Sequence, residues 1–133
     1  MNLMAEPDWS GAALARAAEI GPSGLIAELE AAGLQGRGGA GFPAHIKWKG
    51  VIGQPETVRS VVLSADEGEP GTFKDREVLL RRPDLVIEGL AIAARAVGAS
   101  AVYLYLRGEW EIPWGIVEDA IARFRSAGLL DGL

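Results

Sequence analysis

Four glycines within six positions give this sequence its clearest chemical signal. They are Gly36, Gly38, Gly39 and Gly41, in the segment LQGRGGAGFPAHIKW that spans residues 34–48. Because glycine lacks a Cβ atom, its backbone can adopt a positive φ and approach a ligand closely, so that successive N–H groups can point at a phosphate. A flexible glycine loop beside a helix end is the alternative, and the spacing by itself favours neither.

Charged and aromatic side chains flank this cluster. Arg37 and Lys47 bring positive charge to it, and Phe42 and Trp48 offer flat apolar faces that suit an adenine or a flavin ring. From spacing alone, Lys47 is equally consistent with a phosphate or flavin partner and with a solvated surface position. His45 is the only histidine. It has no second imidazole with which to build a metal site, and we expect it to be structural or on the surface.

Three carboxylates follow the first predicted strand. Asp66, Glu67 and Glu69 lie within four residues of one another. Such close carboxylates repel one another unless solvent, cations or hydrogen-bond donors offset the repulsion. A solvated acidic turn, a set of acceptors for ribose hydroxyls or flavin N–H groups, and a magnesium site all stay open. Nothing in the spacing demands the metal.

The composition indicates one soluble globular domain. The chain has 133 residues, of which 49% are hydrophobic, enough for a single core. The absence of cysteine excludes disulfides, thiol catalysis and cysteine-held metals or iron–sulfur clusters within the chain. A net charge of −5 argues against a broad surface for nucleic acid or anionic membranes.

No targeting or membrane-spanning segment is expected. The first ten residues contain Glu6 and Asp8 and lack a continuous apolar run. The longest apolar stretch, residues 89–106, includes Arg95 and two tyrosines and is typical of a helix followed by a strand. We therefore expect a cytoplasmic protein without direct membrane insertion, either free or on the cytoplasmic face of a membrane complex.

Hydrophobic periodicity predicts a strand–helix–strand–helix order behind an N-terminal helical part. The expected helices cover about 10–19, 23–32, 74–82, 83–97 and 113–127, and the expected strands cover 59–64 and 101–106. The first strand contains three consecutive apolar residues, which suits burial on both faces. This order predicts an α/β fold with a Rossmann-like parallel βαβ core, N-terminal helices and a glycine-rich nucleotide loop.

The predicted core uses one face of each helix. Its members are Leu25, Ile26 and Leu29, then Leu85, Ile92 and Ala96 or Val86, Leu90 and Val97, and finally Ile116, Val117, Ala120, Ile121 and Phe124. Tyr103 and Tyr105 share one strand face, and we expect them to pack in the core. Two strands make a thin sheet, so partner chains or further strands are expected to cover its apolar surface. Ligands are expected at the carboxyl ends of the strands, beside the loops at 64–71 and 107–111.

Four sequence motifs follow one another in the part of the chain from about residue 24 to residue 127. They are GRGGAGFP at 36–43 with Lys47-Trp48, ADEGEPGTFKDR at 65–76, IEG at 87–89 and YLRGE at 105–109. Together they resemble the FMN-binding, NADH-oxidising subunit of respiratory complex I and the related subunits of NAD-linked hydrogenases and formate dehydrogenases. The resemblance implies an N-terminal helical extension over 1–22 and the N-terminal portion of the FMN/NADH-binding domain over 23–133.

The resemblance also implies roles for individual residues. In that family NADH passes a hydride to FMN, electrons leave through iron–sulfur clusters, and the flavin does the chemistry, so no catalytic side chain is expected. The implied FMN-binding residues are Gly36, Arg37, Gly38, Gly39, Gly41, Lys47, Ser64, Asp66 and Glu67. Phe42 would stack on the adenine of NADH, and the charge of Glu69 would favour NADH over NADPH. Iron–sulfur clusters are expected only in partner subunits or in segments outside this chain.

Several positions depart from the family pattern. Ser64 replaces an asparagine, Ala44-His45 replaces Thr-Gly, and Gly50 stands where a second adenine-stacking aromatic is usual. In the family, a second glycine-rich segment further along the chain completes the flavin site. We find no counterpart of that segment in these 133 residues. Three hypotheses follow: part of an NADH-oxidising flavoprotein in a multisubunit complex, a truncated structural or regulatory subunit, or a dinucleotide-binding module without redox activity of its own.

Overall fold

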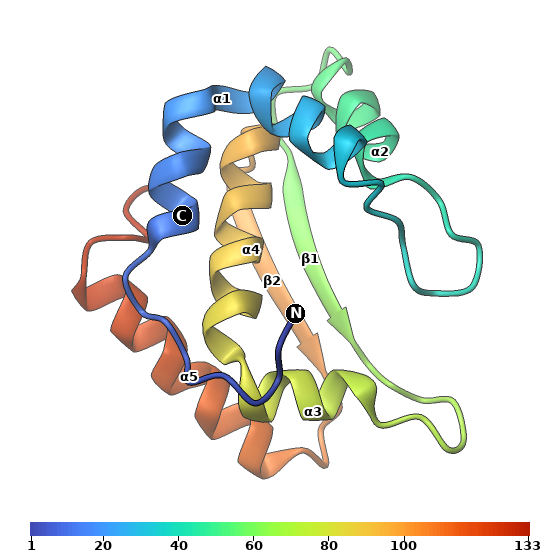
Figure 1. Cartoon of the computed structure of the whole chain (residues 1–133), viewed down its shortest axis with the longest axis vertical. Coiled ribbons are helices and arrows are strands. Elements are labelled where there is room, and N and C mark those ends of the chain that lie inside the picture. The colour runs from blue at the N-terminus through green and yellow to red at the C-terminus, as the bar shows by residue number, and fades with distance from the viewer.

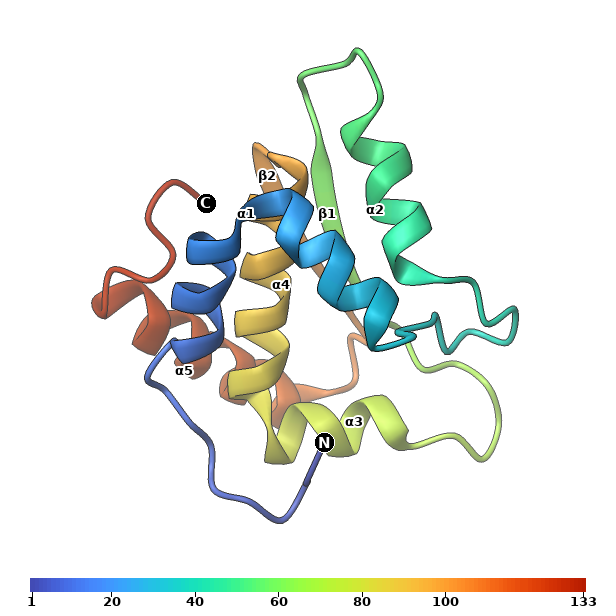
Figure 2. The ribbon, with the colours of Figure 1, turned by 45° about the horizontal axis from the view of Figure 1, so that its top comes forward.

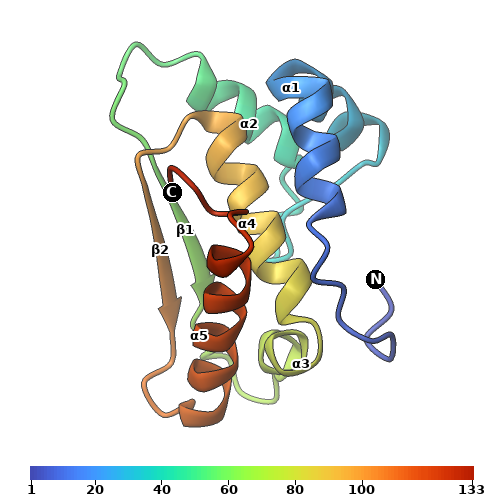
Figure 3. The same ribbon diagram turned by 90° about the vertical axis from the view of Figure 1, so that its left-hand side faces the viewer.

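Two parallel strands with helices packed on one side form the centre of the molecule (Figures 1 and 3). The computed structural model describes all residues from Met1 to Leu133. Its elements are α1 (Ala12–Ala31), α2 (Ala44–Ile52), β1 (Ser60–Ala65), α3 (Lys74–Arg81), α4 (Pro83–Val97), β2 (Ala101–Leu106) and α5 (Glu111–Ser126). The strands pair in parallel, with Ser60 opposite Ala101 and Ala65 opposite Leu106. The predicted α/β class and βαβ core are therefore confirmed. None of the helices combines the length and the apolar character needed to cross a membrane.

The predicted pair of N-terminal helices is present as the two halves of α1. Gly21 breaks the helix with φ 66° and ψ 179°, and Pro22 begins the second half. Ser10 Oγ accepts a hydrogen bond from the N–H of Ala12 at 3.3 Å. Gly33, with φ 61°, follows the C-terminus in the left-handed conformation that glycine favours.

The helix α2 is not among the predicted elements. It has nine residues and none of them is buried, so it carries no hydrophobic face from which it could be predicted. Tertiary contacts stabilise it instead. Arg59 donates hydrogen bonds to the carbonyls of Ile52 at 3.2 Å, Gln54 at 3.1 Å and Val97 at 2.9 Å. One guanidinium therefore sits at the C-terminal ends of both α2 and α4, where the helix dipoles favour a cation.

The core lies between the sheet and the helices α1, α3, α4 and α5. Its nine buried members are Leu14, Ala65, Leu79, Ile87, Ala91, Leu106, Val117, Ala120 and Phe124. On α5, the predicted core residues Val117, Ala120 and Phe124 are buried, and Ile121 packs against the core. On α4, Ala96 and Val97 are buried and Val86 and Ile92 pack against the core, as predicted. Leu85 is exposed, and the most buried side of the helix runs through Ile87 and Ala91, which are not among the predicted core residues. Most of α4 is apolar, so its periodicity does not fix which side faces the core.

One face of the sheet is uncovered (Figure 3). Val62 is 58% exposed, Tyr103 58% and Tyr105 59%, and all three lie on this face together with Ser64. The predictions that β1 is buried on both faces and that the tyrosines pack in the core are therefore wrong for this chain, because helices cover only the opposite face. The expectation that two strands leave apolar surface exposed is confirmed.

The N-terminal segment packs onto the same core. Arg82 and Asp84 form a buried ion pair with an Nη2–Oδ2 distance of 2.6 Å. Asp84 Oδ2 also accepts the N–H of Asp8 at 2.9 Å, and the buried carboxylate of Glu88 accepts the N–H of Leu14 at 3.0 Å. Burial alone would raise the pKa of Asp84, but the guanidinium of Arg82 and the N–H of Asp8 outweigh it and lower that pKa.

Candidate functional site

The two segments that the sequence singles out project from the same side of the molecule (Figures 1 and 2). We define the glycine loop as residues 34–43, between α1 and α2, and the acidic loop as residues 66–73, between β1 and α3. No hydrogen bond or ion pair joins them. The fold thus brings both loops to one side of the molecule, but no polar contact links them.

The glycine loop is closed at its base by backbone hydrogen bonds. The N–H of Gly36 donates to the carbonyl of Phe42 at 2.9 Å, and the N–H of Ala44 donates to the carbonyl of Leu34 at 2.9 Å. Between these bonds Arg37 and most of the other residues of the loop are exposed. The loop is therefore anchored at its two ends and open along its length.

Not all of its glycines are required by the fold of the chain. Gly39 and Gly41 have φ angles of 111° and 62°, which other residues rarely adopt. Gly36 and Gly38 do not have positive φ angles. A Cβ atom at Gly38 would meet nothing within 4 Å, and one at Gly36 would approach only the carbonyl of Phe42, at 3.7 Å. Nothing within this chain explains why these two positions lack side chains, and their lack of side chains leaves the backbone of the loop open to close approach.

The helix α2 begins directly after the glycine loop with an unsatisfied N-terminus. The N–H groups of His45 and Ile46 have no acceptor in the chain, no side chain caps the helix, and its first turn holds no acidic residue. Lys47 lies in the same turn, with its Nζ atom 5.9 Å from the ring centre of Phe42. Free N–H groups, the positive end of the helix dipole and a lysine form an arrangement that suits a negatively charged group.

The His45 side chain is largely buried beside the end of α1. Its Nε2 atom lies 3.9 Å from a carboxylate oxygen of Glu30, and its side chain is 16% exposed. Its Nδ1 atom is buried without a hydrogen-bond partner. The structure gathers no group of three or more histidine, aspartate or glutamate side chains that could hold a metal ion.

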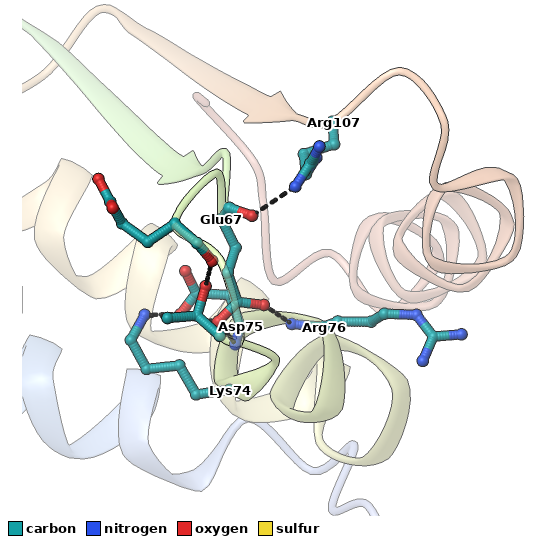
Figure 4. Close-up of polar contacts among 7 residues, drawn as sticks. Glu67, Lys74, Asp75, Arg76 and Arg107 are labelled. Atoms are coloured by element: carbon teal, nitrogen blue, oxygen red, sulfur yellow. Dashed lines mark hydrogen bonds and ion pairs between the residues drawn. The ribbon is translucent and has the colours of Figure 1, made fainter.

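The three carboxylates of the acidic loop have different environments. Asp66 and Glu69 are exposed, whereas the side chain of Glu67 is 3% exposed. Figure 4 shows the Glu67 carboxylate directed at the start of α3, where it accepts the N–H of Asp75 at 3.0 Å and the N–H of Arg76 at 3.4 Å. Burial opposes ionisation of Glu67, but these two donors outweigh it and hold the pKa below its ordinary value.

Glu67 therefore caps α3, as an acid at a helix N-terminus does. A direct contact between its carboxylate and a flavin stays a prediction, and Asp66 and Glu69 are the carboxylates of this loop that face solvent. Ser64, also exposed, lies on the uncovered sheet face opposite Tyr105. The roles implied for these residues and for the glycine loop likewise stay predictions.

Arg107 is a residue of this site that the sequence analysis did not single out. It follows β2, and its Nη1 atom donates a hydrogen bond to the main-chain carbonyl of Glu67 at 2.6 Å. Its guanidinium also pairs with Glu109. The signal that points to it is topological: Ala65 and Leu106 are paired in register, so the residues that follow them leave the sheet side by side.

Known proteins resemble this chain in sequence and in fold. Residues 29–130 match the family described as the Nuo51 FMN-binding domain. The chain is 43% identical over 118 residues to an NADH-quinone oxidoreductase subunit of Aquifex aeolicus, an alignment that covers 89% of the chain and 28% of that relative. It is also 43% identical over 110 residues to the mitochondrial NADH-ubiquinone oxidoreductase 51 kDa subunit of Neurospora crassa, covering 80% of the chain and 22% of the relative.

A solved structure gives the same result for the fold. In the NAD+-reducing [NiFe]-hydrogenase in its H2-reduced state, a polypeptide 40% identical in sequence superposes with a TM-score of 0.83 over 94% of this chain and 22% of that one. The chain thus spans less than a third of the length of these relatives. By its sequence match over residues 29–130 and its superposition, the chain belongs to the Nuo51 FMN-binding domain family.

Proposed function

We propose that this chain supplies one side of an FMN- and NADH-binding site in an NADH-oxidising flavoprotein. The observation that carries the proposal is the open N-terminus of α2 beside a glycine loop in which Gly36 and Gly38 have no role in the chain's own packing. The names of the relatives support an oxidoreductase that works within a multisubunit NADH-linked complex. We also propose that this complex lies in the cytoplasm or on the cytoplasmic face of a membrane.

The residues present fit a flavin nucleotide. The free N–H groups at the start of α2 and the ammonium of Lys47 offer donors and positive charge for its phosphate. The bare positions in the glycine loop leave room for the nucleotide against the backbone. Asp66 offers exposed acceptors for flavin N–H groups, and Ser64 offers one hydroxyl where the family pattern has an amide. FMN, when bound, supplies the hydride acceptor, and the iron–sulfur chemistry belongs to other segments or subunits.

NADH would contact the exposed side chains of the two loops. Phe42 is 45% exposed and is available to stack on an adenine. The carboxylate of Glu69 makes no hydrogen bond or ion pair within the chain. Its uncompensated negative charge would repel the 2′-phosphate of NADPH, which gives a physical reason for a preference for NADH.

The binding role is tested with Lys47→Gln and with Lys49→Gln as its matched control. Both lysines lie on α2, but Lys49 pairs with Glu30 of α1, with an Nζ–Oε2 distance of 3.6 Å, whereas Lys47 lies near Phe42 of the glycine loop. Fluorescence titration with FMN and NADH, carried out on the chain reconstituted with a polypeptide that covers the remaining length of the Aquifex aeolicus relative, should give a weaker affinity for Lys47→Gln and an unchanged affinity for Lys49→Gln. Equal effects of the two substitutions would show that general surface charge, and not a site at α2, binds the nucleotide.

The redox role is tested by reconstitution. The chain should be mixed with a polypeptide that covers the remaining length of the Aquifex aeolicus relative, and flavin absorbance and NADH–ferricyanide activity measured. Because this chain provides only one side of the proposed site, we expect little FMN retention alone and a yellow, active complex after mixing. Two folded components that form no such complex would contradict the proposal and favour a structural or regulatory subunit.

A further inference from the structure

The acidic loop is held through one residue by two separate anchors. The carboxylate of Glu67 is fixed to the first turn of α3, and the main-chain carbonyl of the same residue is fixed to the guanidinium of Arg107 (Figure 4). The first anchor belongs to the helix that follows the loop. The second comes from the end of the neighbouring strand, 40 residues further along the chain.

The exposed carboxylates depend on these anchors for their position. Asp66 directly precedes Glu67, and Glu69 follows it by two residues. Neither side chain has a hydrogen-bond or ion-pair partner in the chain. Further support within the loop comes from Thr72, whose hydroxyl and N–H donate to the carbonyl of Glu69 at 2.6 Å and 3.2 Å. The direction in which Asp66 and Glu69 present their charges is therefore set mainly by the backbone of Glu67.

The hydrogen bond from Arg107 to the carbonyl of Glu67 is of a kind that can hold the loop backbone in place. A guanidinium that donates to a carbonyl makes a charge-assisted hydrogen bond, which is stronger than a neutral one. The side chain of Arg107 is 33% exposed, and Glu109 holds the same guanidinium from the solvent side. A lysine could supply a donor here, but only as a single point charge without the fork that also reaches Glu109.

We propose that Arg107 is a positioning residue that fixes the acidic loop for nucleotide binding. It acts through the carbonyl of Glu67 and touches no ligand itself. The relevance of this positioning to a nucleotide rests on the proposed function, whereas the ordering of the loop does not. Arg107 thereby couples the end of β2 to the two free carboxylates that follow β1.

The test compares Arg107→Gln, Arg107→Lys and Arg81→Gln in the full chain. Arg81 is the matched control, because it is an exposed arginine on α3 that pairs with Glu77 at 2.9 Å and does not reach the loop. Amide hydrogen exchange is measured at the hydrogen-bonded N–H groups that report on the loop and its anchor, those of Thr72, Asp75 and Arg76, and across α4 as an internal reference. We expect Arg107→Gln to speed exchange in the loop by about tenfold or more while α4 is unchanged. Arg107→Lys should lie between Arg107→Gln and the wild type, and Arg81→Gln should match the wild type.

Two results would overturn the proposal. One is an exchange rate in the loop of Arg107→Gln that equals the rate in the wild type. The other is an equal acceleration in the loop and in α4, which would mean that Arg107 supports the whole fold. If Arg107→Gln does not fold, Arg107→Lys decides by the same two criteria.

A parallel titration with NADH separates this proposal from the proposed function. We expect the affinity for NADH to fall in Arg107→Gln and to recover in part in Arg107→Lys. A wild-type chain that binds neither NADH nor FMN, alone or reconstituted, would refute the proposed function, and the exchange data would still decide whether Arg107 positions the loop.

Discussion

Replacing Glu67 with glutamine tests whether this buried acid is an ionised helix cap. The carboxylate accepts N–H groups from Asp75 at 3.0 Å and from Arg76 at 3.4 Å, and its side chain is 3% exposed. Glutamine has nearly the same shape, but it offers one neutral acceptor and turns an NH2 group toward the second donor. The substitution therefore removes the charge and one acceptor and leaves the volume of the side chain almost unchanged.

The expected loss follows from these two bonds. A hydrogen bond to a charged group contributes about 1.5–3 kcal/mol, against roughly 0.5–1.5 kcal/mol for a neutral one. The bond to Arg76 is longer, and Lys74, at 3.8 Å, is 60% exposed, so each contributes less than the bond to Asp75. We expect Glu67→Gln to lower the free energy of unfolding by about 1.5 kcal/mol at pH 7. For a domain of this size, that corresponds to a fall in Tm of about 5 °C.

The pH dependence gives the sharper signature. Because the pKa of Glu67 is lower in the folded state than in the unfolded chain, its ionised form adds stability above about pH 4.3. That contribution is lost as the pH falls through the folded-state pKa. The difference in stability between the wild type and Glu67→Gln should therefore shrink as the pH falls from about 5 through the folded-state pKa. Other acids titrate in this range, but they are common to both proteins and cancel in the difference.

Urea unfolding followed by tryptophan fluorescence at a series of pH values provides the measurement. Glu77→Gln is the control, because Glu77 lies on α3 and pairs with Arg81 but caps no helix. A stability difference that does not change with pH would refute the reasoning, since it would mean that Glu67 contributes by packing and not by charge. An equal loss in Glu77→Gln would refute it as well.

Three further predictions concern the core and the loops. Asp84→Asn should lower the Tm, measured by thermal unfolding, more than Asp119→Asn on the exposed side of α5. It removes the negative charge and one of the two acceptors that the buried guanidinium of Arg82 contacts. Gly38→Ala should leave the Tm almost unchanged and weaken FMN and NADH binding, because a Cβ atom there meets nothing in the chain; unchanged affinity would place the nucleotide elsewhere. Glu69→Gln should raise the affinity for NADPH relative to NADH, and titrations that show no gain would remove Glu69 as the source of discrimination.

Features with a local cause could be predicted from the sequence. Gly33 and Gly98 end helices because the chain needs a left-handed residue there, with φ angles of 61° and 65°. Gly21 and Pro22 divide α1 for the same kind of reason. The β2 strand is present over the predicted residues 101–106. In each case a few neighbouring residues contain the whole signal.

Features set by distant contacts could not be predicted. The helix α2 has no buried residue and depends on Arg59, which lies outside it. Tyr103 and Tyr105 form a pattern typical of a core strand, and only the absence of a covering layer in this chain leaves them exposed. The three acids of the acidic loop lie within four consecutive residues, yet Glu67 alone is buried, because only its carboxylate reaches the start of α3.

The two helices that follow the candidate loops, α2 and α3, differ in how the N–H groups at their N-termini are satisfied. Both begin on the side of the molecule from which the loops project, and both have N–H groups that need acceptors. At α3 the chain satisfies them internally through Glu67, so that end is closed to an added anion. At α2 no acid is present and Lys47 adds a positive charge, so the acceptor must come from water or from a ligand. The phosphate of a bound nucleotide is therefore expected at α2, while the acidic loop, closed and held by α3 and Arg107, presents its carboxylates to the polar groups of the nucleotide.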